Sequence, residues 1–120
     1  MRVFSTCIFA AACCALSGAA LVQSMPFDGH WSVVLQTTVG KCEPEIKGAF
    51  IVKSIDIGAA ADSAIVADGA VEKSGNMWVR FSAGEDQYRA QGSLRGASGE
   101  GAWSSGTRYC GGRWKAVRGK

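Results

Sequence analysis

The sequence has little of what most catalytic and metal sites require. Its 120 residues include a single histidine, His30, and five cysteines, of which Cys7, Cys13 and Cys14 lie near the start. The other two cysteines and one histidine are too few for a zinc site with the usual ligand spacing. The chain also lacks the G-x-S-x-G elbow of many hydrolases and the glycine fingerprint of dinucleotide-binding proteins. We therefore expect no metal and no cofactor.

Acidic residues are missing from residues 1–24 as well. In this segment Arg2 is followed by apolar and small residues from Val3 to Val22. A short positive start, an apolar core and small residues before a cleavage site are typical of a secretory signal peptide. We predict that residues 1–24 form such a signal, cleaved after Ser24, with cleavage after Ala20 as the alternative.

Cleavage would leave residues 25–120, which are enough for a single domain with a modest core. We expect this domain to be secreted or periplasmic, with no stable membrane span. Two alternatives keep the protein at a membrane: about 20 apolar residues can anchor a chain in a bilayer, and Cys13 or Cys14 can carry a lipid. The abundance of alanine and serine, and the small residues at the end of the segment, favour a cleaved signal.

Charge is divided unevenly along the expected domain. From Met25 to Gly75 there are four basic and seven acidic residues, a net charge of −3, whereas from Asn76 to Lys120 there are eight basic and three acidic residues, a net charge of +5. A basic half attracts anionic partners. Solubility of polar strand faces is the alternative explanation. We expect no nucleic-acid partner, because an exported protein seldom meets one.

Two cysteines, Cys42 and Cys110, remain after cleavage. An even pair in an exported chain predicts one disulfide. It would close a loop of roughly 70 residues, which stabilises a fold by about 4 kcal/mol in the chain-entropy model.

Apolar and polar residues alternate along most of the domain. In residues 86–95, Tyr88 and Ala90 share one face. Arg89 and Gln91 share the other, which is the pattern of a half-buried strand. Seven segments have strand patterns: 30–38, 49–57, 63–72, 76–82, 86–95, 99–105 and 110–118. With short turns between them, they predict an all-β antiparallel meander that forms a closed or nearly closed barrel of about seven or eight strands. A β-sandwich is the alternative.

The segment FDGHWS places an acid, the histidine and a serine at Asp28, His30 and Ser32. In an extended strand, residues two positions apart are separated by about 6.6 Å, too far for a proton relay. We therefore predict that these residues open the first strand and that the protein is not an enzyme. The acidic residues available to an unrecognised enzyme site are Asp28, Glu85, Asp86 and Glu100.

Tryptophan is well placed to fill a small barrel. Trp31 lies in the first predicted strand, and Trp103 and Trp114 lie in the last two. Because an indole buries a large area, three of them can cap and fill a narrow interior.

The Gly-His-Trp sequence at residues 29–31, in which Gly29 precedes Trp31 by two positions, resembles the Gly-x-Trp opening of the calycins, the lipocalin and avidin group. The closing RWKAVR is similar to the end of avidin-type chains. The resemblance implies a barrel in which an arginine of the last strand, Arg113 or Arg118, packs on Trp31 as a cation–π contact.

The whole run from FDGHW to CGGRW also resembles small exported proteins of alphaproteobacteria, which implies no activity. Small exported calycin-like barrels include protease inhibitors, so inhibition is one form that binding can take. We therefore expect a non-catalytic binding or inhibitor-like protein of the cell envelope. Its partner would be an envelope polymer, a protein or a small apolar ligand. A self-associating structural component of the surface is the alternative.

The best candidate for a binding surface lies in the second half of the domain. Trp78 falls on the polar face of its predicted strand, beside Arg80. An exposed tryptophan flanked by basic residues is typical of contact surfaces. We predict that Trp78, Arg80, Arg89 and Arg95 contribute to binding. Packing of Trp78 on the second face of the sheet is the alternative.

Overall fold

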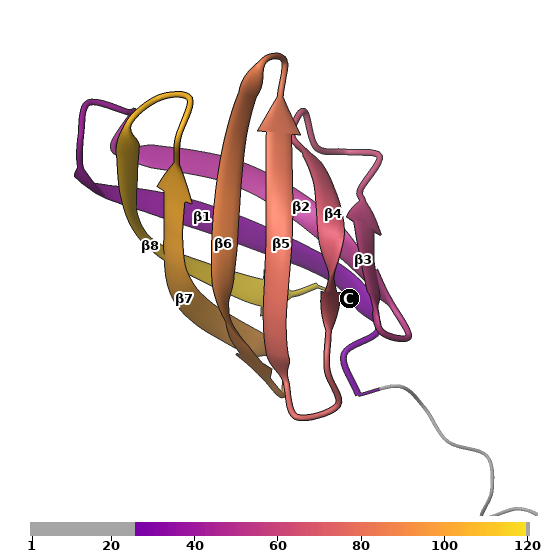
Figure 1. Ribbon diagram of the computed structural model, residues 1–120. Helices are drawn as coiled ribbons and strands as arrows, with labels where there is room; N and C mark the ends of the chain where they lie inside the picture. Colours follow the sequence, from indigo (N-terminus) through magenta and orange to yellow (C-terminus); the bar gives the residue numbers. More distant parts are fainter. Residues whose placement is uncertain (1–25, 120) are drawn as a thin grey trace, which may run out of the picture.

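The computed structural model describes residues 26–119, so the predicted signal peptide lies outside the described residues. The described chain forms an all-β closed barrel, as predicted (Figure 1). Its eight strands are β1 (Gly29–Val39), β2 (Glu45–Lys53), β3 (Asp56–Ala59), β4 (Val66–Val71), β5 (Asn76–Ala83), β6 (Asp86–Arg95), β7 (Ser98–Ser105) and β8 (Cys110–Arg118).

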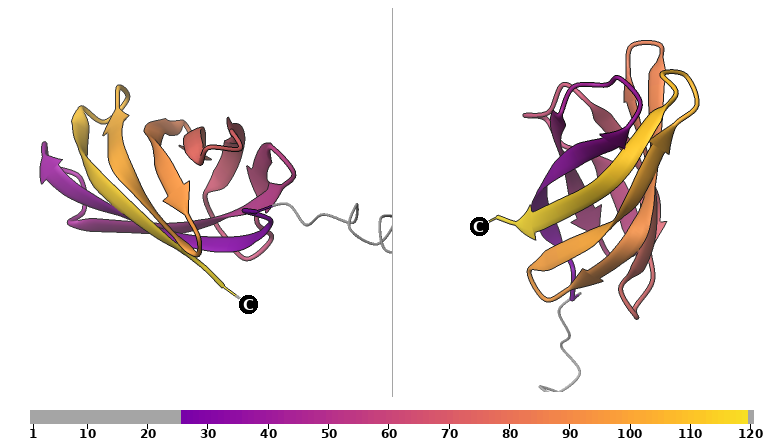
Figure 2. Two further views of the ribbon diagram at one scale, coloured as in Figure 1. Left: turned by 90° about the horizontal axis from the view of Figure 1, so that it is seen from below. Right: turned by 90° about the vertical axis from the view of Figure 1, so that its left-hand side faces the viewer.

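Each strand pairs antiparallel with the next along the chain, and β8 pairs with β1 to close the cylinder. The closing pair begins with Trp31 opposite Arg118 and includes Leu35 opposite Trp114. In Figure 1, β5, β6 and β7 run side by side, and β1 and β2 cross behind them at a steep angle. The views in Figure 2 show β8 lying beside β1 along this seam.

One predicted strand is wrong in its extent. Residues 49–57 were expected to be one strand because the run is rich in β-branched residues, but the chain reverses within it. Ser54 has a φ of 62°, in the left-handed region that turns require. The Asp28 carboxylate accepts a hydrogen bond of 2.7 Å from the Ser54 backbone N–H, which holds this turn in place. The run therefore supplies the end of β2 and the first half of β3.

Side chains fill the interior of the barrel. The largest that are fully buried are Trp31, Trp114, Phe50, Phe81, Leu35, Leu94, Val52 and Val79. Trp31 and Phe50 stack almost parallel, with their ring centroids 6.0 Å apart. Tyr88 and Trp103 meet edge to face at 5.8 Å. Rings in these arrangements add specific attraction to the area they bury, and the aromatic side chains make up much of the packed core.

Trp103 spans a neighbouring strand from inside the barrel. Its partner across the β7–β8 ladder is Gly112. Because Gly112 has no side chain, the indole of Trp103 reaches past β8 and donates a hydrogen bond of 3.1 Å to the carbonyl of Gln36 on β1. A Cβ on Gly112 would collide with that same carbonyl oxygen. The contact thus joins three strands, β7, β8 and β1, at the seam where the barrel closes.

Trp114 makes the reciprocal contact. It faces Gly101 across the same ladder. Its indole reaches past β7 and donates a hydrogen bond of 3.1 Å to the carbonyl of Gln91 on β6. A Cβ on Gly101 would meet both the indole nitrogen and the Gln91 oxygen. Two tryptophan–glycine pairs therefore alternate direction along one strand pair.

Arg118 covers Trp31 at the end of the barrel near the N-terminal side of β1. Its guanidinium carbon lies 5.5 Å from the centroid of the Trp31 ring, in cation–π range. The same guanidinium donates to the carbonyls of Pro26 at 2.8 Å and Asp28 at 3.2 Å. A Cβ on Gly29 would approach the Arg118 side chain to 3.0 Å, which explains glycine two positions before the tryptophan. The other candidate for this role, Arg113, is exposed on the outer face.

The predicted disulfide between Cys42 and Cys110 is confirmed. Its Cα atoms are 6.0 Å apart, and both residues are buried. The bond connects the β1–β2 loop to the first residue of β8, so it lies at the same seam as the Trp103 contact.

Removing both sulfurs, in Cys42→Ala/Cys110→Ala, should lower the free energy of unfolding by about 2–4 kcal/mol, because the unfolded chain loses its cross-link. For a domain of this size the melting temperature should fall by roughly 10 °C or more. Calorimetry of the variant and of the reduced wild type should give similar midpoints. Equal midpoints for the variant and the oxidised wild type would contradict the structural role of the bond.

Gly112→Ala should destabilise the barrel by about 2 kcal/mol, as overpacking of a core does, because the new methyl group collides with the Gln36 carbonyl. Gly58→Ala is the matched control, since an added Cβ there meets nothing within 4 Å. Urea unfolding of both variants measures the difference. Equal urea midpoints for the two variants would show that the packing of Trp103 across β8 does not require glycine at residue 112.

Candidate functional site

A shallow depression of about 540 Å³ lies on the outer surface of β5, β6 and β7. Its lining consists of Trp78, Val79, Arg80, Arg89, Ala90, Gln91, Ala102, Trp103 and Ser104. Val79, Ala90 and Trp103 are buried members of these strands, so the exposed members of the lining supply the side chains that solvent meets. These include three of the four residues predicted to bind.

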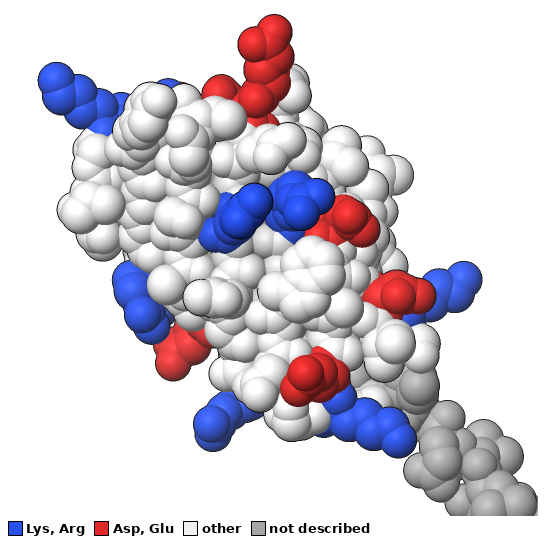
Figure 3. Space-filling model, in the orientation of Figure 1, with Lys and Arg blue, Asp and Glu red and all other residues white. Residues whose placement is uncertain are grey.

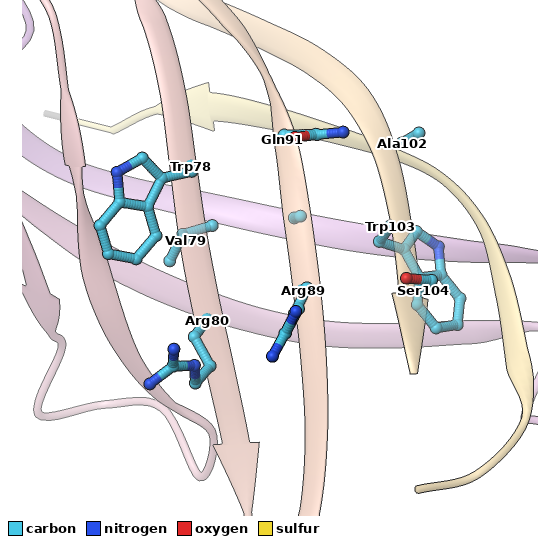
Figure 4. A pocket seen from close by; sticks show the side chains of 9 residues that line it. Trp78, Val79, Arg80, Arg89, Gln91, Ala102, Trp103 and Ser104 are labelled. Atoms are coloured by element: carbon cyan, nitrogen blue, oxygen red, sulfur yellow. The ribbon is translucent and has the colours of Figure 1, made fainter. Parts of the chain in front are cut away.

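Strand register brings the exposed side chains together. Trp78 on β5 lies opposite Gln91 on β6, which lies opposite Ala102 on β7. Arg80, Arg89 and Ser104 form the next outward-facing row across the same strands. Figure 4 shows Trp78 and Arg80 projecting from β5, with Arg89 extending from β6. Two short rows thus place an aromatic ring beside two guanidinium groups.

Trp78 is the tryptophan that the fold does not use for its core. Its side chain is 51% exposed, whereas those of Trp31, Trp103 and Trp114 are at most 4% exposed. On the outer face its row continues with Gln91 and then with the small side chain of Ala102, which leaves the ring open to solvent. Tryptophan and arginine are the residue types most enriched among those that dominate binding at contact surfaces.

Arg80 and Arg89 face each other directly across the β5–β6 ladder. Like charges in directly opposite positions destabilise a sheet. Among residues 26–119, neither guanidinium has a carboxylate oxygen within ion-pair distance, although Asp68 on β4 is the cross-strand neighbour of Arg80. Basic side chains lie near the centre of this face of the molecule in Figure 3. The row of Asp68, Arg80 and Arg89 therefore has a net positive charge, because Asp68 offsets only one of the two guanidinium groups.

Arg95, the fourth predicted residue, does not join this site. It lines a second depression of about 590 Å³ over the ends of β6, β7 and β8. Glu100 and Lys115 face each other across the β7–β8 ladder in the same lining, beside the exposed Val117. Glu100 offsets the charge of Lys115 across the ladder, so Arg95 is the one basic side chain of this lining without an acid opposite it.

The sequence reasoning missed the polar and small members of the site. Gln91 was placed on the same strand face as Arg89, but neither Ala102 nor Ser104 was singled out. Their proximity depends on the pairing of β6 with β7, and this is set by the tight two-residue turn between Arg95 and Ser98. The sequence does contain a signal for this proximity. A two-residue turn fixes the register of the two strands, and the alternation of apolar and polar residues then shows which side chains share the outer face.

The residues of FDGHWS are not brought together as a relay. The Asp28 carboxylate holds the Ser54 turn, and Ser32 is exposed on β1. Nε2 of His30 instead lies 2.9 Å from a carboxylate oxygen of Asp62, in the loop between β3 and β4. This hydrogen bond from His30 lowers the pKa of the Asp62 carboxyl. Sequence reasoning did not single out Asp62, because 32 residues separate it from the histidine.

The other acids considered for an enzyme site are also dispersed. Glu85 and Asp86 lie at the β5–β6 turn, at the opposite end of the barrel from Asp28, and Glu100 lies on the outer face of β7. Near that turn, Arg108 donates 3.0 and 3.4 Å hydrogen bonds to Glu43 and to the Tyr88 hydroxyl.

These contacts raise the pKa of Arg108, first through the hydrogen bond to Tyr88 and then through the hydrogen bond to Glu43 and its negative charge. The pKa of Glu43 is lowered, first by its own backbone amide and then by Arg108. Arg108 thus connects the β1–β2 loop, β6 and the β7–β8 loop near the disulfide, which is a structural task.

Replacing His30 with alanine should raise the pKa of Asp62 toward the ordinary aspartate value, since the carboxylate loses its donor. A depressed carboxyl pKa stabilises the fold above the unfolded-state pKa, and that contribution disappears as the pH falls through the folded-state pKa. Carbon-detected NMR titration of the Asp62 carboxyl group measures the change. The pKa of Glu43, set at the other end of the barrel, should stay lowered in both proteins. An Asp62 midpoint that does not move in His30→Ala would contradict the contact.

Between residues 26 and 119, no group of three or more histidine, cysteine, aspartate or glutamate side chains converges as metal ligands do. This part of the chain also contains no helix long and apolar enough to cross a membrane.

No protein-family model matches the chain, and no curated protein matches it.

Proposed function

We propose that the protein is an exported, non-catalytic binding module of the cell envelope that holds an anionic partner on the outer face of β5–β7. One observation carries the proposal. The half-exposed Trp78 lies in the same depression as Arg80 and Arg89, which oppose each other without an ion-pair partner among residues 26–119. An aromatic ring and paired guanidinium groups are suited to an anion attached to an apolar or ring-shaped group.

Export is supported by two observations of different kinds. The first 24 residues have the composition of a signal peptide. The Cys42–Cys110 disulfide is typical of proteins in an oxidising compartment, because cytosolic thiols are kept reduced. The Arg118–Trp31 contact further supports the calycin-like resemblance, which remains part of the proposal.

Binding on the outside is favoured over a ligand held inside the barrel. The interior is occupied by tryptophan, phenylalanine and leucine side chains that are less than 2% exposed. The closed ladder, in which each strand pairs with two neighbours, also works against self-association through strand edges. The outer face is the surface where exposed aromatic and charged side chains gather in a depression.

The repulsion between the two arginines distinguishes a role in binding from a role in solubility. Arg80 already has one acid opposite it, Asp68 on β4, and has a second arginine opposite it on β6. If the two arginines served only to keep the sheet soluble, an acid in place of Arg89 would do so with less repulsion. Functional sites commonly retain such unfavourable arrangements at the expense of stability. We therefore expect Arg89→Gln to leave the melting temperature unchanged or higher at low salt.

The double variant Arg80→Gln/Arg89→Gln should bind anionic polymers at least tenfold more weakly than the wild type, because each charged hydrogen bond contributes about 1.5–3 kcal/mol. Isothermal titration with polygalacturonate and with polyphosphate measures the affinity for carboxylate and phosphate polymers. The matched control, Arg95→Gln/Lys115→Gln, removes the same net charge from the second depression and should retain affinity. Equal losses of affinity in the two double variants would show that binding depends on net charge alone, and this would contradict the proposed site.

A further inference from the structure

We infer that the anionic partner is an acidic polysaccharide, whose carboxylate is held between Arg80 and Arg89 and whose sugar ring packs on Trp78. This rests on the proposed function and specifies its ligand. Three properties of the depression support it: the number and geometry of its charges, the open indole face, and its neutral polar lining.

The charges fit isolated carboxylates better than a dense row of phosphates. The lining contains two guanidinium groups in one cross-strand pair and no acidic residue. Guanidinium groups bind carboxylates through two parallel hydrogen bonds. Beyond the pair, the row continues to Asp68 on one side and to Ser104 on the other. A polymer with phosphate at every unit would bring further negative charge against Asp68, whereas a uronate chain spaces its charges by whole sugar rings.

Trp78 provides the surface on which a sugar ring of the polysaccharide can pack. Its indole is 51% exposed and lies one row from the arginine pair, on the same strand as Arg80. The face of an aromatic ring is electron-rich and attracts polarised C–H groups, which a pyranose presents on its flat side. In the Trp78 row, the small Ala102 leaves space two strands away for a neighbouring sugar.

Neutral polar groups complete the lining. Gln91 lies between Trp78 and Ala102, and Ser104 lies beside Arg89. An amide and a hydroxyl both donate and accept hydrogen bonds, as sugar hydroxyls require. A bilayer surface fits less well, because the ring and both arginines line a hollow, and a flat membrane would lie across its rim.

The test is isothermal titration of the purified protein with oligomers of two uronates, polygalacturonate and alginate. Each is compared with its methyl ester, which keeps the rings and removes the charge. Polyphosphate and vesicles of anionic phospholipid supply negative charge without sugar rings. We expect at least one uronate to bind, its ester to bind at least tenfold more weakly, and both ring-free probes to bind more weakly than the uronate.

Two variants separate the ring contact from the charge contact. Trp78→Ala should weaken uronate binding at least tenfold, whereas Trp78→Phe, which keeps an aromatic face, should retain most of it. Neither should change the melting temperature greatly, because Trp78 lies outside the core. Indole fluorescence should change on uronate binding in the wild type, and that change should shrink in Trp78→Phe.

The failures are distinguishable. If polyphosphate or vesicles bind through the arginines and Trp78→Ala has no effect, the anion-binding function stands and the polysaccharide is wrong. If a uronate and its ester bind equally, the arginine pair does not recognise the carboxylate and the inference is also wrong. If no anionic probe binds, or binding is the same in Arg80→Gln/Arg89→Gln, both the inference and the proposed function are wrong.

Discussion

The barrel depends on a tryptophan packed across a glycine of the neighbouring strand. Trp103 over Gly112 and Trp114 over Gly101 fill the space that the missing side chains leave, and each indole N–H satisfies a carbonyl one strand further away. Each contact therefore joins three strands with one side chain. Because the two point in opposite directions along β7 and β8, together they connect β6 through β1, which includes the seam where the cylinder closes.

A filled interior determines where recognition can occur. The aromatic side chains that hold the strands together occupy the space in which a larger barrel would place a ligand. The outward-facing side chains of the same strands do not pack in the core. In β5, for example, Val79 is buried whereas Trp78 and Arg80 are exposed. The rigid core thereby fixes the positions of the outer side chains, although none of them contributes to it.

Much of this architecture could be predicted from the sequence, because period-two alternation and a single cysteine pair are local or countable signals. The reversal at Ser54 was not predictable from its β-branched neighbours, since its backbone N–H donates a hydrogen bond to the carboxylate of a residue 26 positions earlier. The contact of His30 with Asp62 was not predictable for the same reason, because the two residues are 32 positions apart in the sequence. At the candidate site, Trp78 and the two arginines were found from strand faces, but excluding Arg95 required the register between strands, which three-dimensional pairing decides.

The cross-link between Cys42 and Cys110 has a consequence for an intact molecule that meets proteases. Residues 42 to 110 form a covalent ring, so a single backbone cut in any turn within that span leaves both fragments attached. Those fragments would also stay side by side, because β8 hydrogen-bonds to β1 beyond the ring. A nicked chain can thus keep its shape, and a denaturing gel would separate the two fragments only after the disulfide is reduced.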